Sequence, residues 1–260
     1  MDEATDTVKL TLREGVAWIE FDRAPVNAID WPMLLLARRR FAEAIDDPAA
    51  RVIVLASRNE RYFSAGADLA SFRGIGEKRM GEWADDCHAL VRLMRASPKP
   101  LLAAINGTAV GGGLEMTLHC DLRFAAANAR LGQPEIAISF IPPVGATQAL
   151  ARLIGRPRAI RYLYDGRLVE AREALEWGLV DELVEPERLR AHVQEYALAL
   201  AARPAPALAA IRRTITLGGG MAFEDGLAFE RDTAAALAAT AHFEEGVDAF
   251  LAKRKPVWPA

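Results

Sequence analysis

The chain contains 260 residues with a mass of 28.3 kDa, which suits one large domain or two small ones. Hydrophobic residues make up 52% and charged residues 26% of the sequence, and this balance excludes a disordered or collagen-like protein. The net charge of −3 argues against a dedicated nucleic-acid binder. No apolar run is long enough to cross a bilayer, so we expect no membrane partner.

The cysteine content and the N-terminal sequence indicate the compartment. Cys87 and Cys120 are too few to build a disulfide framework, which favours a reducing environment. The acidic, polar residues 1–6 have neither the apolar core of a secretory signal nor the arginines of a mitochondrial presequence. We therefore expect a cytoplasmic protein.

The first half of the chain alternates short β-like runs with helical patterns. In chain order we expect a hairpin over residues 8–12 and 16–21, a helix capped by Asp30 and ending at 46, a buried strand over 52–56, a loop over 59–67, a helix over 82–95, a strand over 101–105, a glycine-rich turn over 107–113, a short helix over 114–120 and a strand over 122–126. This alternation predicts an α/β fold with parallel strands.

After Gly145 the pattern becomes almost entirely helical. Helices are expected over residues 145–154, 157–164, 171–177, 186–202, 205–217, 223–240 and 243–253, and the segment 179–184 alone resembles a strand. We therefore predict an α/β core over residues 1–200 and a helical region over 201–260. The helical region is expected to pack on the core or on another subunit.

Residues 64–69, Ser-Ala-Gly-Ala-Asp-Leu, connect a buried strand to the next helix. The small side chains and Gly66 allow the backbone to approach a ligand closely, and amides exposed at such a turn can donate to a negative oxygen. Taken alone, the segment also fits a plain strand-to-helix loop in which Asp68 caps the helix.

A second segment, residues 106–115, follows a buried strand and opens a helix. Its three consecutive glycines, Gly111 to Gly113, expose free N–H groups at a helix start, where negative charge is favoured. The segment lacks the Gly-Lys-Ser/Thr of a phosphate-binding loop and the glycine spacing of a dinucleotide-binding turn. The alternative is a tight helix–strand contact that glycine alone permits.

Glu135 stands directly after Pro134 and before an apolar run. A partly buried carboxyl at this position would have a raised pKa, which suits a general acid or base. A solvated glutamate in a surface turn is the alternative interpretation of this segment.

Together these segments resemble the enoyl-CoA hydratase/isomerase (crotonase) family. The family's S/A-A-G-A-D-L turn is similar to residues 64–69, its N-G-x-A-x-G-G-G-x-E stretch to 106–115 and its G-Q-P-E segment to 132–135. A Cys-Asp-Leu at 120–122 lies between them, and the tail over 250–256 also looks like that of the family. The resemblance extends from residue 8 to residue 256.

The resemblance implies a spiral of ββα units followed by a helical trimerisation region, and hence a homotrimer or homohexamer. It implies that the backbone amides of Ala67 and Gly112 hold the thioester oxygen of an acyl-CoA substrate while an enolate forms. By the same resemblance, Glu135 exchanges the proton at C2, and Glu115 orients and activates the water that attacks C3. The presence of both glutamates favours an enoyl-CoA hydratase of fatty acid metabolism, with an isomerase or another acyl-CoA enolate reaction as the alternative.

One departure from the family pattern affects this prediction. Where the family commonly reads I-P-G-x-G-G-T, this chain has Pro143 and Ala146 in place of two glycines. Proline lacks the N–H that helps to hold the water in family hydratases, and Ala146 narrows the loop. We therefore expect modest activity on crotonyl-CoA.

In relatives, CoA lies over two segments that correspond here to residues 24–28 and 65–69. The resemblance therefore assigns CoA contacts to Ala24, Val26, Ala28, Ala65, Gly66, Asp68 and Leu69. Lys253 and Lys255 are candidates to meet the phosphates from a neighbouring subunit, or form a solvated tail. The acyl pocket is expected between residues 72–95 and 140–144. CoA is part of the substrate, and no separate cofactor is expected.

The sequence also bears on metal binding and on RNA binding. The four histidines and two cysteines are scattered without metal-ligand spacing, so we expect no metal site. The run Arg38-Arg39-Arg40 suggests an RNA-binding homologue, since one branch of the family binds RNA through a basic helix. Here Glu43, Asp46 and Asp47 follow at once, and such a run usually marks a solvated helix face. No nucleic-acid partner is therefore expected.

Overall fold

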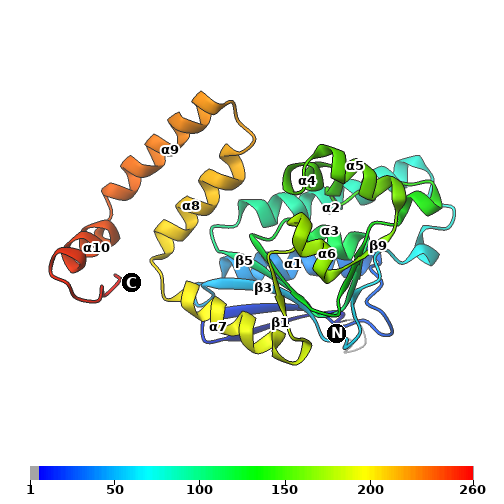
Figure 1. The fold of residues 1–260 in the computed structure, drawn as a ribbon, viewed down its shortest axis with the longest axis horizontal. Helices are drawn as coiled ribbons and strands as arrows, with labels where there is room; N and C mark the ends of the chain where they lie inside the picture. Colours follow the sequence, from blue (N-terminus) through cyan, green and yellow to red (C-terminus); the bar gives the residue numbers. More distant parts are fainter. Residues whose placement is uncertain (1–5, 260) are drawn as a thin grey trace.

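A computed structural model describes residues 6–259 of the chain. Its larger sheet has six strands in the order β1-β2-β3-β5-β7-β10 (Figure 1). The strands are β1 (Val8–Arg13), β2 (Val16–Phe21), β3 (Val52–Ser57), β5 (Leu101–Ile105), β7 (Leu122–Ala126) and β10 (Glu182–Val184). The β1–β2 hairpin is antiparallel, and each later strand pairs in parallel. The predicted hairpin and the parallel α/β layering are thus confirmed.

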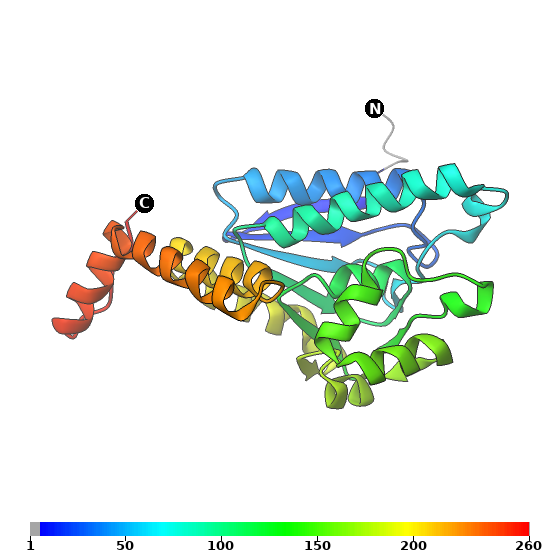
Figure 2. The ribbon, with the colours of Figure 1, turned by 90° about the horizontal axis from the view of Figure 1, so that it is seen from above.

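The large sheet is covered on both faces. All residues of β2 and β5 are buried, as expected for strands of a parallel sheet with a layer on each side. Helices α1 (Trp31–Asp46) and α2 (Glu77–Ala96) lie side by side over one face, and α7 (Leu189–Ala201) covers the other (Figure 2). The Asp30 carboxylate caps α1 by accepting the Met33 N–H at 2.9 Å, as the sequence predicted.

A second, four-stranded sheet has the order β4-β6-β8-β9 and carries the candidate site. Its members are β4 (Tyr62–Ser64), β6 (Thr108–Val110), β8 (Arg130–Gly132) and β9 (Leu168–Glu170). The sequence prediction missed this sheet: it placed a loop over 59–67 and a turn over 107–113, and expected no strand near 168. Each of these strands has three residues, too few for an alternating pattern, so their pairing is fixed by tertiary contacts. Helix α2 also begins five residues before the expected start at 82, within a polar, glycine-containing stretch.

The remaining helices of residues 69–188 are short. They are the 3-10 turns η2 (Leu69–Phe72), η3 (Glu135–Ile138) and η4 (Pro186–Arg188), and the helices α3 (Gly112–Thr117), α4 (Ala146–Leu153), α5 (Arg156–Asp165) and α6 (Ala171–Trp177). Through residue 201, buried residues from both sheets and these helices form a single hydrophobic core.

Three helices form an arm that extends away from this core (Figures 1 and 2). They are α8 (Ala205–Gly218), α9 (Phe223–Ala238) and α10 (Ala241–Leu251). Among these helices, Arg212 and Ala249 are the buried residues. No helix within residues 6–259 is both long enough and apolar enough to span a membrane.

Candidate active site

The turn after β4 is held by backbone hydrogen bonds to the segment that precedes α1. The Ala65 N–H donates to the Val26 carbonyl at 3.0 Å, the Ile29 N–H to Gly66 at 2.7 Å, and the Asp68 N–H to Ile29 at 2.9 Å. These bonds flank Ala67, whose own N–H has no backbone acceptor within residues 6–259. The turn is therefore fixed while the Ala67 donor stays available.

Two buried polar side chains support this turn, and the sequence prediction gave neither a role. Asn27 is fully buried with a φ of 52°, and its Nδ2 donates to Ser57 Oγ at 2.8 Å and to the Phe63 carbonyl at 3.1 Å. Ser64 Oγ donates to the Asn27 carbonyl at 2.7 Å and accepts the Gly66 N–H at 3.1 Å. In the sequence, the one available signal for such a role was that Asn27 and Ser64 are polar residues among apolar neighbours.

The glycine-rich segment brings a second free amide to the same place. Gly111, with a φ of 51°, precedes α3, and the N–H of Gly112 at the start of that helix has no backbone acceptor in the described part of the chain. A Cβ placed on Gly66 would lie 3.4 Å from the Gly111 Cα, so the two turns are in contact. Ala67 follows Gly66 in the chain, and Gly112 follows Gly111. The contact between the two turns therefore brings Ala67 and Gly112 together.

Glu115 lies on α3 and has no exposed surface. Its Oε2 accepts the Val144 N–H at 2.7 Å and the Ala146 N–H at 3.0 Å, whereas its buried Oε1 has no partner among residues 6–259. Burial raises the pKa of Glu115 to about 8. The Ala146 amide opposes this rise, the charge of Glu135 adds to the rise, and the Val144 amide also opposes the rise.

Glu135 opens η3 and is half-buried beside the glycine turn. A Cβ on Gly111 would lie 2.7 Å from Glu135 Oε1, so a larger residue here would displace the Glu135 carboxylate, and the positive φ also favours glycine. With its amide oriented to donate, buried Gln133 places its nitrogen 3.2 and 3.1 Å from the two Glu135 oxygens. Burial raises the pKa of Glu135 as well.

The two carboxylates form an interacting pair, because the charge of Glu135 raises the pKa of Glu115. When two such groups are both shifted upward, they titrate together and hold one proton between them over a range of pH. The amides of Val144 and Ala146 favour the negative charge on Glu115. This arrangement can therefore supply one base and one acid side by side.

Pro143 contributes no N–H, and nearby amides of its turn are directed to Glu115. The amides on either side of Gly145, those of Val144 and Ala146, both bind Glu115 Oε2. These two donors are consequently occupied by the carboxylate. The site thus departs from the family pattern at the donor expected to hold water, while the Glu115 carboxylate remains firmly placed.

The segments expected to contact CoA lie next to each other, joined by the Ala65–Val26 hydrogen bond. Asp68 has a structural role here: its carboxylate accepts the Ala70 N–H at 3.2 Å and pairs with Arg23 at 3.0 Å. Of the remaining expected contacts, Ala24 and Leu69 are exposed, Val26, Ala28 and Ala65 are partly buried, and Gly66 is buried.

Lys253 and Lys255 lie at the end of the arm, on exposed chain. The arm and the turn between β2 and α1 occupy opposite ends of the molecule (Figures 1 and 2). These lysines are therefore remote from the expected CoA segments of their own chain.

The basic cluster on α1 is largely neutralised. Arg38 pairs with Asp86 at 2.7 Å, and Arg40 pairs with Glu43 at 2.8 Å and with Asp6 at 2.9 Å. In the part of the chain that the structure describes, no group of three or more histidine, cysteine, aspartate or glutamate side chains is arranged to hold a metal ion.

Comparisons with known proteins agree with this geometry. Residues 11–260 match the enoyl-CoA hydratase/isomerase family. A crotonyl-CoA hydratase of Syntrophomonas wolfei is 32% identical over 97% of both chains, and a 2,3-dehydroadipyl-CoA hydratase of Escherichia coli is 38% identical over 88% of this chain and 89% of its own. The crystal structure of an enoyl-CoA hydratase from Geobacillus kaustophilus superposes with a TM-score of 0.94 at 31% identity, covering 97% of this chain and 96% of that one.

These matches include the three motifs and the arm. The chain belongs to the enoyl-CoA hydratase/isomerase family and has the crotonase fold, as the sequence resemblance predicted. The family acts on acyl-CoA substrates.

Proposed function

We propose that this protein is an enoyl-CoA hydratase that adds water across the double bond of a 2-trans-enoyl-CoA. The observation that carries the proposal is a buried and a half-buried carboxylate, both with a raised pKa, beside two free backbone amides on adjoining turns. Relatives named as hydratases, at 32% and 38% identity, support the same reaction.

In the proposed reaction, the amides of Ala67 and Gly112 bind the thioester oxygen. In the form of the pair whose shared proton lies on Glu135, the Glu115 carboxylate takes a proton from water through Oε1 as the water oxygen bonds to C3. The electrons of the double bond move toward the thioester and form an enolate, whose charge the two amides stabilise. Glu135 then gives its proton to C2, so the pair again holds one proton at the end of the reaction.

A second reaction, shift of the double bond, is favoured by one observation. Pro143 provides no N–H, and the neighbouring amides of Val144 and Ala146 are already bound to Glu115. Fewer donors are therefore available to hold a water, whereas enolate formation at C2 is unaffected. For the same reason we expect modest turnover of crotonyl-CoA.

A panel of acyl-CoA thioesters in deuterated water distinguishes these reactions. Net addition of water supports the hydratase, and deuterium entering C2 without hydration supports the isomerase. We expect Glu115→Gln and Glu135→Gln each to lower kcat by roughly 10²–10⁴, the usual contribution of an acid or base residue. Exposed Glu187→Gln is the matched control. Full activity in either site variant would contradict the proposal.

We further propose that the protein assembles as a homotrimer or homohexamer through its arm. The arm exposes large apolar side chains, including Phe223 at 78%, Phe250 at 83% and Leu251 at 73%. In this assembly Lys253 and Lys255 of one subunit would reach CoA bound to another. A cytoplasmic location and a role in fatty acid metabolism remain predictions from the sequence and the family.

A further inference from the structure

His119 contacts the turn over residues 144–146, whose amides hold Glu115. It follows α3, and its Nε2 is 2.8 Å from the carbonyl oxygen of Val144. Because a carbonyl oxygen can only accept a hydrogen bond, Nε2 carries the proton and donates. The Val144 carbonyl lies in the backbone between the Val144 and Ala146 amides, the two donors that hold Glu115 Oε2.

The turn and the imidazole ring fit closely against each other. Gly145 has a φ of 93°, and a Cβ at this position would lie 3.0 Å from His119 Nε2 and 3.1 Å from Cε1. Glycine is therefore required here both for the backbone conformation and for the space that the ring occupies. The ring contacts the turn at Gly145, and its hydrogen bond holds the carbonyl of Val144.

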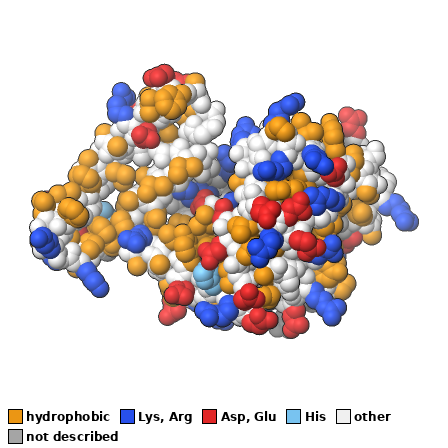
Figure 3. Space-filling model, in the orientation of Figure 1, with side chains coloured by type: hydrophobic (Ala, Val, Ile, Leu, Met, Phe, Trp, Pro, Cys, Tyr) orange, Lys and Arg blue, Asp and Glu red, His pale blue; other side chains and the backbone are white. Residues whose placement is uncertain are grey.

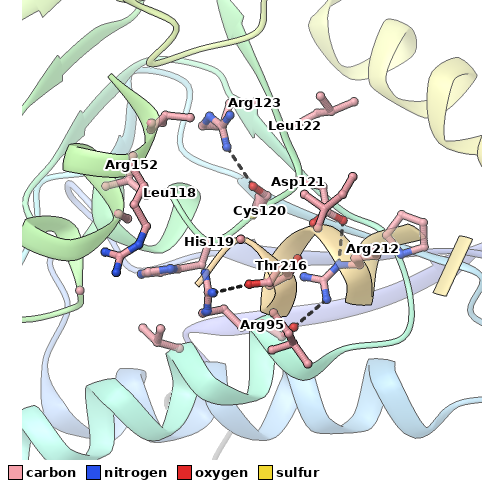
Figure 4. Close-up of a pocket in the computed structure, with 18 of the residues that line it drawn as sticks. Arg95, Leu118, His119, Cys120, Asp121, Leu122, Arg123, Arg152, Arg212 and Thr216 are labelled. Carbon is pink, nitrogen blue, oxygen red and sulfur yellow. Dashed lines mark hydrogen bonds and ion pairs between the residues drawn. The ribbon is translucent and has the colours of Figure 1, made fainter. Parts of the chain in front are cut away.

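The ring also borders a cavity of about 1090 Å³ between the core and α8 (Figure 4). Its Nδ1 is buried and has no partner among residues 6–259. Burial lowers the pKa of His119 to about 4; the Val144 carbonyl opposes this shift, and electrostatic interactions with Arg95 and His88 on α2 add to it. The ring is therefore neutral at physiological pH and keeps its donor on Nε2.

We propose that His119 is a positioning residue for the Glu115 carboxylate. By holding the Val144 carbonyl, it fixes the turn whose amides favour the negative charge on Glu115 and place its carboxylate for the reaction. The inference deepens the proposed function and rests on it for the catalytic consequence. The effect on the turn itself is independent of which reaction the protein performs.

Two substitutions of His119, by leucine and by glutamine, distinguish this positioning role from simple filling of the core. His119→Leu fills most of the ring's volume and removes the donor. His119→Gln places an amide nitrogen close to the position of Nε2 and keeps the donor. A residue that only fills space would give similar results in both variants.

The first measurement is catalysis on the acyl-CoA that the wild type turns over. We expect His119→Leu to lower kcat about 10-fold or more with KM within about twofold, because a displaced catalytic group slows the chemical step. Weaker donation to Glu115 also raises its pKa, so the acid limb of kcat/KM moves to higher pH. The other titratable groups facing Glu115 are Glu135 and Cys87, which neither variant changes. His119→Gln restores kcat and the pH profile.

The second measurement is hydrogen–deuterium exchange of the amides in residues 144–146, which requires no substrate. We expect exchange at least about 10-fold faster in His119→Leu and close to the wild type in His119→Gln. Equal protection in all three proteins, or equal kcat and pH profiles in both variants, overturns the inference. Absence of acyl-CoA turnover by the wild type overturns the proposed function, and the exchange measurement still decides the role of His119.

Discussion

The core and the arm place their polar and apolar groups in opposite ways. The core buries polar side chains such as Asn27, Glu115 and Gln133 and gives them hydrogen-bond partners within the same chain. The arm leaves its large apolar side chains on the surface, and these gather on its visible face (Figure 3). The candidate chemistry is thus assembled within one chain, whereas the arm exposes the apolar surface on which the proposed self-association depends.

The largest expected effect is a loss of kcat when the core loses one of its two free amides, that of Gly112. Gly112→Pro removes the N–H at the first position of α3, where proline is tolerated. We expect kcat to fall by roughly 10²–10³, the usual cost of losing one such donor. Gly112→Ala keeps the N–H, and its Cβ would lie at an ordinary distance of 3.5 Å from Val144 Cγ2.

Steady-state kinetics and thermal melting of both variants check this prediction. The alanine variant is the control for the added carbon atoms and should retain most of the wild-type activity. Equal kcat in the proline and alanine variants, with both proteins folded, would show that the Gly112 amide does not stabilise the transition state.

The next effect concerns the exposed surface of the arm. We expect Phe250→Asp to weaken self-association by at least about 30-fold, the effect of removing a central apolar anchor. Phe250 is 83% exposed in the single chain, so α10 itself should remain folded. Arg13→Asp at the exposed end of β1 is the control. Sedimentation at several protein concentrations measures the change, and identical association of the two variants would exclude α10 from the interface.

Arg212 joins the two regions and provides a third test. Its guanidinium pairs with Asp121 at 2.8 Å and donates to carbonyls at the end of α2, including that of Met94 at 2.8 Å. Loss of a buried, paired charge costs on the order of 3 kcal/mol, so we expect Arg212→Leu to lower Tm by roughly 10 °C. Neighbouring Arg213 is exposed, and Arg213→Leu should change Tm by less than about 2 °C. Similar melting of both variants would show that the contact adds little stability.

The sequence predicted the core more completely than the site. Long buried strands and the Asp30 cap are local signals, and the motifs placed Ala67, Gly112, Glu115 and Glu135 in segments that the fold brings together. The three-residue strands of the small sheet carry no such local signal.

The sequence also did not predict which groups hold the two carboxylates in place. His119 is buried, and its role was not visible in the sequence. Its contact with the Val144 carbonyl joins residues 25 positions apart, so it depends on how α3 packs against the turn before α4. The same holds for the arm, whose helical pattern was visible although its projection from the core was not.

The smallest expected effect is the pH dependence of stability caused by burying Glu115. Its pKa rises from an ordinary 4.5 to about 8 in the folded chain, so the native state retains a proton that the unfolded state has lost. The associated stability is fully present below pH 4.5 and is lost as pH rises through about 8. Glu115→Gln cannot ionise, so its Tm relative to the wild type should increase by several degrees between pH 5 and pH 8. Melting curves at these two pH values provide the test, with Glu187→Gln as the exposed control. A Tm difference that does not change with pH would mean that Glu115 is already ionised throughout this range, and that the turn around Gly145 stabilises its charge more strongly than burial opposes it.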